Sequence, residues 1–292
     1  MRGRIGAMVA LARPYQWVKN GLVLAPLVFS RRLLVPRDCA LALAAVLAFS
    51  ALSSAGYVIN DITDREADRL NPEKRHRPLA SGELDVGTAV RMAVVLGALA
   101  VGMSIALGRA FVGIAVLYAG LQFAYSLWTK RHVVLDVISV SLGFVLRAFA
   151  GGAAIGVEVS PWLIFITFVL ALFLVLARRR HELVVLGDGA EAHRSALGQY
   201  SIRLTDQMIS IVAGATLVSY MIYTASSEIQ AKLGTRHLYL TVPFAAFGIL
   251  RYLYLIEERD EGGDPGRLLL TDGPLLLAVL LWMATIVALL YL

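Results

Sequence analysis

Four polar residues that could bind a metal ion stand close together after the second apolar stretch of the chain, in the run N-D-I-T-D-R-E-A-D at residues 60–68. Spacings of three and four residues place side chains on one face of a helix, and this face would carry Asn60, Asp61, Asp64 and Asp68. Carboxylates stacked in this way repel one another unless a cation lies among them. Mg²⁺ is the natural candidate, because it binds oxygen ligands, commonly a few carboxylates together with substrate phosphates. The alternative is a solvated helix end whose acids pair with neighbouring arginines.

Three fixed positive charges, Lys74, Arg75 and Arg77, follow in the run N-P-E-K-R-H-R-P-L at residues 71–79. Acids that hold a metal ion beside cations that face outward form a site for a polyphosphate, because the metal clamps the anion and the cations neutralise the rest of its charge. The alternative is that this basic run only reflects membrane topology.

The elements that must position these groups are membrane spans. The chain has 292 residues, of which 58% are hydrophobic and 16% charged, whereas soluble domains are roughly 45–50% apolar and about 25% charged. This composition excludes a disordered chain, a disulfide scaffold and a soluble nucleic-acid-binding protein. A membrane helix needs about 20 mainly apolar residues. Nine segments are candidates, near residues 20–34, 39–59, 86–107, 110–128, 133–152, 161–177, 207–225, 238–256 and 274–291.

The distribution of positive charge predicts the orientation of these spans. With a cytosolic N-terminus, 18 of the 27 lysines and arginines lie on the cytosolic side and six on the opposite side, which agrees with the positive-inside rule. Arg147 falls within a span and should therefore face the interior of the bundle. We predict an all-α polytopic membrane protein with about nine transmembrane helices, forming one domain over residues 1–292. Its cytosolic cap loops would lie at about 60–85 and 178–206.

These motifs resemble those of the UbiA-type intramembrane prenyltransferases. The acidic run and the following K-R-x-R-P loop are similar to the first acidic motif of that superfamily. The run from Tyr125 to Lys130, before Asp136, is similar to the Y-x-x-x-K segment after the family's fourth span. The resemblance implies a bundle of about nine helices that binds a Mg²⁺–diphosphate substrate near the cytosolic face of the membrane.

One departure from the family pattern bears on the reaction. Most members carry a second acid-rich motif after the sixth span, but this chain has R-R-R-H-E at residues 178–182, which we interpret as a second phosphate clamp. The run R-P-Y-Q-W-V-K-N at residues 13–20 is similar to the opening of one branch, and L-T-D-G-P-L at residues 270–275 is weakly similar to its last cytosolic turn. That branch transfers 5-phosphoribose from phosphoribosyl pyrophosphate to decaprenyl phosphate, a polyprenyl phosphate, and releases pyrophosphate. It supplies an arabinan precursor for cell-wall biosynthesis.

The resemblance implies the following roles. Asp61, Asp64 and Asp68 are the catalytic and Mg²⁺-binding residues, and the cofactor is Mg²⁺. The residues expected to bind substrate phosphates are Lys19, Asn20, Asn60, Lys74, Arg75, Arg77, Tyr125, Lys130, Arg131, Arg178, Arg179 and Arg194. This large number of lysines and arginines suits a reaction that brings together a diphosphate, a sugar phosphate and a lipid phosphate. The lipid phosphate is already anionic, so it can attack without a general base.

Two other functions remain as alternatives. An aromatic prenyltransferase of quinone or haem biosynthesis would use a prenyl diphosphate and would be expected to carry the second acidic motif. A transporter would need polar residues at mid-membrane, where Arg147 stands nearly alone. The expected location is a bacterial-type plasma membrane with the active site facing the cytosol, and a homo-oligomer is one of the assemblies that the sequence leaves open. The sequence assigns no role to Asp136 and fixes neither the lipid length nor the number of Mg²⁺ ions.

Overall fold

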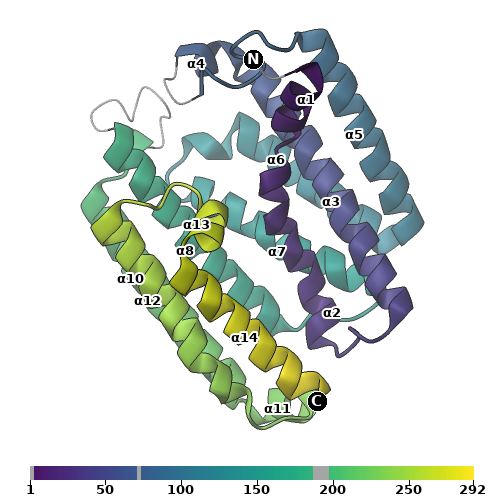
Figure 1. The fold of residues 1–292 in the computed structure, drawn as a ribbon, viewed down its shortest axis with the longest axis vertical. Coiled ribbons are helices and arrows are strands. Elements are labelled where there is room, and N and C mark those ends of the chain that lie inside the picture. Colours follow the sequence, from purple (N-terminus) through teal and green to yellow (C-terminus); the bar gives the residue numbers. More distant parts are fainter. Residues whose placement is uncertain (1–2, 71–73, 187–196) are drawn as a thin grey trace. The chain divides into compact units, whose positions relative to one another are not determined.

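The protein is an all-helical, multi-pass integral membrane protein (Figure 1). The computed structural model describes residues 3–70, 74–186 and 197–292, and the regular structure within these ranges is helical throughout. Eight helices of the described residues are long and apolar enough to cross a membrane. They are α3 (Pro36–Thr63), α5 (Val86–Leu107), α6 (Arg109–Leu127, which runs on into the turn η2 at Thr129–Arg131), α7 (Leu135–Ile155), α8 (Pro161–Leu186), α10 (Ile202–Ala225), α12 (Val242–Arg259, preceded by the turn η5 at Leu238–Thr241) and α14 (Gly273–Tyr291).

The segment predicted as the first span, residues 20–34, does not form a long helix. It is divided between the 3₁₀ helix η1 (Pro14–Leu24) and the short helix α2 (Ala25–Phe29), which contains Pro26. A proline lacks the amide hydrogen that a helix interior requires, and the apolar run is short. Within the described residues, the spans that fit a membrane are therefore eight of the nine candidates.

The remaining helices are short; α1 precedes the spans and the others lie between them. They are α1 (Arg4–Ala12), α4 (Arg65–Leu70), η4 (Leu197–Gln199), α11 (Ser227–Leu233) and α13 (Pro265–Thr271). The contacts divide the chain into two compact units: the first comprises residues 1–25, 35–126 and 146–158, and the second comprises residues 26–34, 127–145 and 159–292. The assignment of residues 1–292 to a single domain stays a prediction.

Helix α3 is the central element of the first unit, and it packs against α5, η1 and α1. The face of α3 that packs inward is lined by small residues such as Ala45 and Ala48, which let neighbouring backbones approach closely. Phe49 of the same face meets the Phe111 ring edge-on, with 5.7 Å between the ring centres. The opposite faces of α5 and α6 carry exposed apolar side chains such as Leu99 and Phe123, as expected for helices that face lipid.

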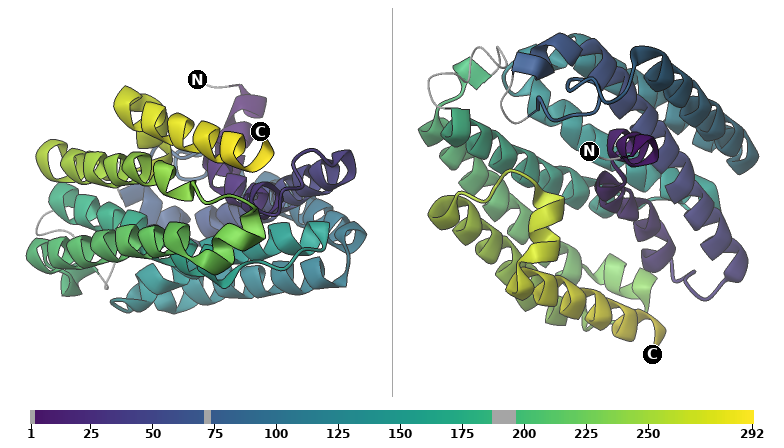
Figure 2. Two further views of the ribbon diagram at one scale, coloured as in Figure 1. Left: turned by 90° about the horizontal axis from the view of Figure 1, so that it is seen from below. Right: turned by 45° about the horizontal axis from the view of Figure 1, so that its top comes forward.

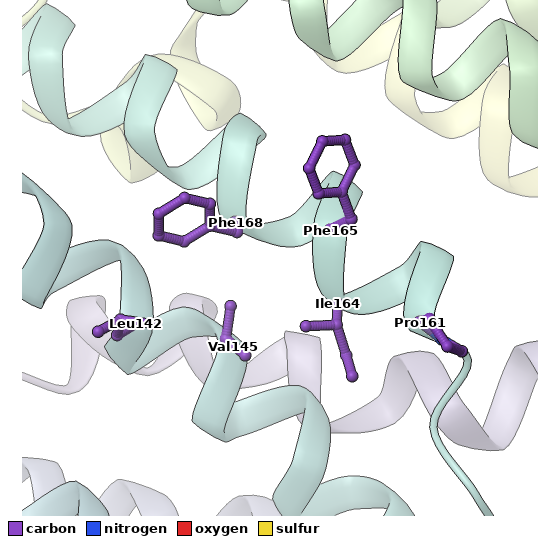
Figure 3. A pocket seen from close by; sticks show the side chains of 6 residues that line it. All are labelled: Leu142, Val145, Pro161, Ile164, Phe165 and Phe168. Atoms are coloured by element: carbon purple, nitrogen blue, oxygen red, sulfur yellow. The ribbon is translucent and has the colours of Figure 1, made fainter.

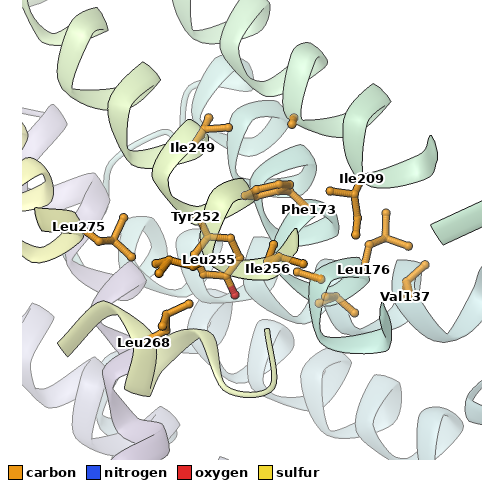
Figure 4. Close-up of a cluster of buried hydrophobic side chains, with 13 residues drawn as sticks. Val137, Phe173, Leu176, Ile209, Ile249, Tyr252, Leu255, Ile256, Leu268 and Leu275 are labelled. Atoms are coloured by element: carbon orange, nitrogen blue, oxygen red, sulfur yellow. The ribbon is translucent and has the colours of Figure 1, made fainter. Parts of the chain in front are cut away.

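In the second unit α8 packs against α10, and α12 packs against α14, as Figures 1 and 2 show. The core of this unit is built around Phe173 of α8 and Tyr252 of α12, whose ring centres lie 5.4 Å apart (Figure 4). Leu255 and Leu275 complete the contact of α12 with its neighbours. Each fully buried side chain of this size contributes about 1.5–3 kcal/mol to apolar burial in a water-exposed protein. In the lipid environment, by contrast, packing and hydrogen bonds hold the helices together.

An apolar pocket of about 480 Å³ lies between α7 and α8. Its lining consists of Leu142, Val145, Pro161, Ile164, Phe165 and Phe168 (Figure 3). The residues come from two spans and offer only hydrocarbon and aromatic surface, so the pocket suits a hydrocarbon chain.

The start of α14 generates a testable prediction. Asp272 accepts a hydrogen bond from the Leu275 amide and pairs with Arg251 at 2.8 Å, and this arginine holds the pKa of the Asp272 carboxyl below its ordinary value. Asp272→Asn keeps a capping side chain but removes the charge, so it should cost about 0.5–1 kcal/mol at neutral pH. Because the folded-state pKa is lowered, this contribution is present above the unfolded pKa of about 3.9 and is lost as the pH falls through the folded-state pKa.

The measurement is thermal unfolding in detergent at neutral and acidic pH, with Arg251→Gln and the double variant completing a double-mutant cycle. Additive losses across the cycle, or a loss that does not diminish in acid, would contradict an ion pair at this position.

Candidate functional site

The acidic run lies where α3 ends and α4 begins. Asp64 is the C-terminal cap of α3, and its backbone leaves the ideal helical geometry at φ −92° and ψ 6°. The helical hydrogen bonds nevertheless continue across the break, from the Asp64 amide to Asn60 at 2.9 Å and from the Asp68 amide to Asp64 at 2.8 Å. The two helices therefore keep the predicted spacing of the acids.

Two of the three acids are buried and share one arginine. Arg77 Nη1 lies 3.0 Å from Asp61 Oδ1 and 2.6 Å from Asp68 Oδ2. Asp61 is only 3% exposed, and the same Oδ1 atom also accepts a hydrogen bond from Arg13 Nη2 at 2.6 Å. Burying a carboxylate costs several kcal/mol unless it is paired. The two arginines therefore make a charged Asp61 tolerable at this depth.

The electrostatics of Asp68 show how tightly this centre is enclosed. Burial raises the pKa of the Asp68 carboxyl above its ordinary value, although the Arg77 guanidinium acts in the opposite direction. Asp61 also raises the pKa of Asp68 by repulsion between like charges. Lys74 also lowers this pKa by its positive charge, and a further cation close to the two carboxylates would relieve the repulsion between them.

The oxygen atoms at this centre fit a hard divalent cation. Mg²⁺ is commonly held by one or two carboxylates, with substrate phosphates and water completing its six ligands. Asp61 and Asp68 supply two carboxylates that already converge on one nitrogen atom of Arg77, and Asn60 precedes Asp61 in the chain. Three or more His, Cys, Asp or Glu side chains are nowhere in the described ranges gathered closely enough to form a complete protein-only metal site. The third predicted ligand, Asp64, is half-buried at the cap of α3.

Asn60 is fixed by a residue that the sequence did not single out. Its Oδ1 atom accepts a hydrogen bond from Ser126 Oγ at 2.8 Å. Ser126 adjoins Tyr125, a predicted phosphate-binding residue that is half-buried at the end of α6. The end of α6 is thereby tied to the acidic run of α3.

The run at residues 13–20 follows α3 as a polar seam. Arg13 bonds to Asp61, Trp17 Nε1 donates to Ser54 Oγ at 3.0 Å, and Asn20 Nδ2 donates to Ser50 Oγ at 3.0 Å. Arg13 itself adopts a left-handed conformation with φ 53°, which ends α1 and turns the chain into η1. Its side chain is the contact with the acidic centre that the sequence prediction missed. The signal available was that Arg13 opens the R-P-Y-Q-W-V-K-N run, of which only Lys19 and Asn20 were predicted to bind phosphate.

Asn20 and Arg147 form a buried hydrogen-bonded network. Arg147 is 4% exposed and lies in the interior, as predicted; its Nε donates to Asn20 Oδ1 and its Nη2 donates to Tyr118 Oη, both at 2.8 Å. The guanidinium also lies over the Tyr118 ring, 5.0 Å from its centre. Asn20, predicted to bind phosphate, thus has both ends of its amide engaged inside the protein. The geometry supports a role in holding η1 to α3 and α7.

Arg179 is a buried ion-pair residue of the second unit. It lies in α8, is 3% exposed and donates from Nε to Asp136 Oδ2 of α7 at 2.8 Å, while its Nη1 contacts Glu182. Asp136 is fully buried and accepts a second hydrogen bond from the Tyr200 hydroxyl at 2.8 Å. Burial raises the pKa of this hydroxyl, which therefore stays protonated and able to donate. The structure gives Asp136, which had no predicted role, the position of a helix-to-helix tie.

The neighbouring arginines are also paired with acids. Arg180 bonds to Asp206 of α10 at 2.7 Å and to Asp260 at the end of α12 at 3.0 Å, and Arg178 bonds to Glu182 at 3.3 Å. Arg179 and Arg180 of α8 therefore connect this helix to α7, α10 and the end of α12. The interpretation of residues 178–182 as a phosphate clamp stays a prediction, while their contacts establish a structural role.

Two glycines allow the loop after α12 to lie directly on this part of α8. A Cβ atom on Gly262 would come within 2.8 Å of the Ala177 carbonyl oxygen, and one on Gly263 within 2.7 Å of the His181 ring. His181 Nδ1 in turn lies 2.6 Å from the Asp260 carbonyl oxygen. The loop after α12 thus packs directly on α8 at Ala177 and His181, while the side chain of Arg178 is 45% exposed.

Lys130 and Arg131 lie in the turn η2, four and three residues before a strained residue. Val134 has φ 69°, a conformation that β-branched residues rarely adopt. Its amide donates to the Tyr200 hydroxyl at 2.8 Å, which secures the strained backbone between η2 and α7. Strain held in this way is common beside functional residues.

The other predicted phosphate-binding residues differ in their exposure. Lys19, Lys74 and Lys130 are half-buried, whereas Arg75, Arg131 and Arg178 are exposed. Arg194 lies outside the described residues.

With the fold and the acidic centre established, comparison with known proteins identifies the family. The profile of the UbiA prenyltransferase family matches residues 22–271. The chain belongs to the UbiA prenyltransferase family and is an integral-membrane enzyme of that family.

Among its relatives, two carry the same name. A decaprenyl-phosphate phosphoribosyltransferase of Corynebacterium glutamicum is 36% identical over 97% of this chain and 86% of its own length. Another decaprenyl-phosphate phosphoribosyltransferase, from Mycobacterium tuberculosis, is 32% identical over 97% of this chain and 93% of its own length. The fold is similar to that of a UbiA homologue from Archaeoglobus fulgidus bound to GPP and Mg²⁺, with a TM-score of 0.71 and 20% identity over 98% of this chain and 100% of that one.

The buried pair Arg179–Asp136 allows a prediction that separates a structural role from phosphate binding. Arg179→Gln leaves a buried carboxylate without its charged partner and should lower the free energy of unfolding by about 3–5 kcal/mol. Adding Asp136→Asn removes the stranded charge and should restore part of that loss.

Thermal unfolding in detergent measures both effects, and Arg178→Gln is the matched control. Its side chain is 45% exposed in an ion pair of the same helix turn, so this change should cost less than about 1 kcal/mol. An Arg179→Gln protein as stable as wild type would contradict the structural role.

Proposed function

We propose that this enzyme transfers 5-phosphoribose from phosphoribosyl pyrophosphate to a polyprenyl phosphate such as decaprenyl phosphate, with release of pyrophosphate and with Mg²⁺ as cofactor. The observation that carries the proposal is the buried pair Asp61 and Asp68 at the end of a membrane span, converging on one point and surrounded by arginines. The names of the relatives that match over nearly the whole chain support the choice of substrates.

The proposed metal ligands are Asp61, Asp64 and Asp68, with Asn60 beside them. A bound Mg²⁺ ion would neutralise charge on the pyrophosphate as it leaves. Within the chain, Arg13 and Arg77 hold the Asp61 carboxylate in place, and Ser126 orients the Asn60 amide. The acids are therefore ordered before substrate arrives.

The reaction exchanges one bond at C1 of the ribose. The bond from C1 to the pyrophosphate oxygen breaks, and a bond from C1 to an oxygen of the lipid phosphate forms, while the sugar gains oxocarbenium character in between. The lipid phosphate enters as an anion, so its attack requires no proton transfer to a side chain. The chain's contribution is to bind and orient charged groups and to neutralise the departing one.

The cations of the loop after α4 are suited to the phosphate groups. Arg75 is exposed, and Lys74 and Arg77 are half-buried next to the acids. On the basis of the family resemblance, we also assign phosphate binding to Lys19 of the first unit and to Lys130, Arg131 and Arg178 of the second. The active site would face the cytosol in a bacterial-type plasma membrane.

An aromatic prenyltransferase is the competing function. It would use a prenyl diphosphate, and the UbiA homologue from Archaeoglobus fulgidus is bound to one, GPP, together with Mg²⁺. The arginines of residues 178–180 stand against it, since the aromatic enzymes would carry acids there. The deciding experiment supplies purified enzyme in lipid nanodiscs with Mg²⁺, phosphoribosyl pyrophosphate and decaprenyl phosphate, and follows pyrophosphate release. Turnover only with a prenyl diphosphate and an aromatic acceptor would overturn the proposal.

The same assay tests the acidic centre. Asp61→Asn keeps the shape of the side chain but removes the charge that would hold the metal, so we expect transfer to fall by about 100-fold or more, or ~2.7 kcal/mol of transition-state stabilisation. Glu66→Gln is the matched control, because Glu66 lies on α4 close to the acids but its side chain is 75% exposed and paired with Arg69. An Asp61→Asn protein that is as active as Glu66→Gln would show that Asp61 has no role in the reaction.

A further inference from the structure

Arg77 occupies the point on which the two buried acids converge. One nitrogen atom, Nη1, lies 2.6 Å from Asp68 and 3.0 Å from Asp61. The lone pairs of Asp61 Oδ1 and Asp68 Oδ2 that accept from the Arg77 guanidinium are not free for a metal ion, and the two positive charges repel. A divalent cation that binds these two oxygen atoms must therefore compete with Arg77.

The surroundings of Arg77 allow its side chain to move while its backbone stays in place. The Arg77 amide bonds to the Lys74 carbonyl and its carbonyl accepts from the Ser81 amide, both at 2.9 Å. Arg65 and Arg69 of α4 bond to the carbonyl oxygens of Leu79 and Ala80. The side chain itself is 27% exposed, so the guanidinium has solvent into which it can swing.

Arg13 keeps Asp61 paired when Arg77 moves away. Its Nη2 atom contacts the same Oδ1 atom at 2.6 Å, and its side chain is less exposed than that of Arg77. If Arg77 leaves, Asp61 keeps its ion pair with Arg13, whereas Asp68 loses its 2.6 Å ion pair with Arg77. The departure of Arg77 therefore costs Asp68 a short charge contact that a metal ion can replace.

We propose that Arg77 is a placeholder for the divalent cation, holding Asp61 and Asp68 in register until metal and diphosphate bind together and then transferring its guanidinium to the diphosphate. This inference rests on the proposed metal-dependent function and adds its regulation. A guanidinium offers five donors in a planar fork that suits phosphate oxygens. The metal alone has to displace Arg77 without compensation, but the metal with a diphosphate gives Arg77 a new partner.

The consequence is that the chain binds the divalent cation weakly by itself and more tightly together with the anion. Such coupling is reciprocal, so the metal should also strengthen binding of the anion. This coupling would leave the acids without a metal ion when no diphosphate substrate is bound.

The test measures binding rather than turnover, with the full-length protein in nanodiscs. Free Mn²⁺, detected by electron paramagnetic resonance, reports affinity for the metal alone, and radiolabelled inorganic pyrophosphate with saturating Mg²⁺ reports affinity for the anion. Arg77→Gln should bind Mn²⁺ about 10-fold more tightly than wild type, equivalent to about 1.4 kcal/mol, and should bind pyrophosphate about 10-fold more weakly. Arg77→Lys, which keeps a charge without the fork, should lie between the two in both measurements.

Arg75→Gln is the charge-matched control. It removes one positive charge from the same turn, but Arg75 is exposed, so its affinity for Mn²⁺ alone should stay close to that of wild type. Arg77→Gln binding Mn²⁺ no better than wild type would overturn the placeholder, because it would show that Arg77 only supports the metal site. An equal increase in Mn²⁺ affinity in Arg77→Gln and Arg75→Gln would also overturn the placeholder, since the loss of one positive charge from this turn would then explain the increase. Asp61→Asn should weaken Mn²⁺ binding. Equal Mn²⁺ affinities of wild type and Asp61→Asn would instead overturn the proposed metal site itself.

Discussion

A charge that is buried in a membrane protein has to be paired, and the pairing of Asp61 is the interaction on which the first unit depends. Asp61 lies in the last turn of a membrane span, where water cannot solvate it, and it is paired by Arg13 and Arg77 from two other parts of the chain. One arginine stands where α1 turns into η1, and the other stands in the loop after α4. The same carboxylate that could hold a metal therefore also brings the elements of the site together.

The second unit obeys the same constraint with a different result. Asp136 is fully buried, and Arg179 and the Tyr200 hydroxyl satisfy it. Arg180 adds links to α10 and α12. Here the charged residues tie helices together, as expected where lipid removes the hydrophobic drive for helix association and polar contacts take a larger share.

Together these contacts explain how one set of residue types serves two purposes. Arg13 and Arg77, which pair with Asp61, have side chains that are 18% and 27% exposed, and the exchange of partners proposed for Arg77 requires such exposure. The side chain of Arg179, which pairs with Asp136, is 4% exposed and belongs to the fixed frame of α7 and α8. Exposure and the availability of a second partner separate the two groups, since both consist of the same side chain.

The sequence alone determined the membrane class, the position of nearly all spans and the acidic run with its spacing. These properties follow from local patterns: long apolar runs can only be spans, and residues three and four apart share a helical face. It also placed Arg147 in the interior, because a cation in lipid has nowhere else to go.

Only the tertiary structure decided which charges pair. Three contacts join residues that are far apart in the chain: Arg13 with Asp61, Arg179 with Asp136, and Arg147 with Asn20. The structure also replaced the predicted first span by the consecutive short helices η1 and α2. A sequence pattern shows that a cation is present, but its role depends on the acid that folding brings within hydrogen-bonding distance and on the water that folding excludes.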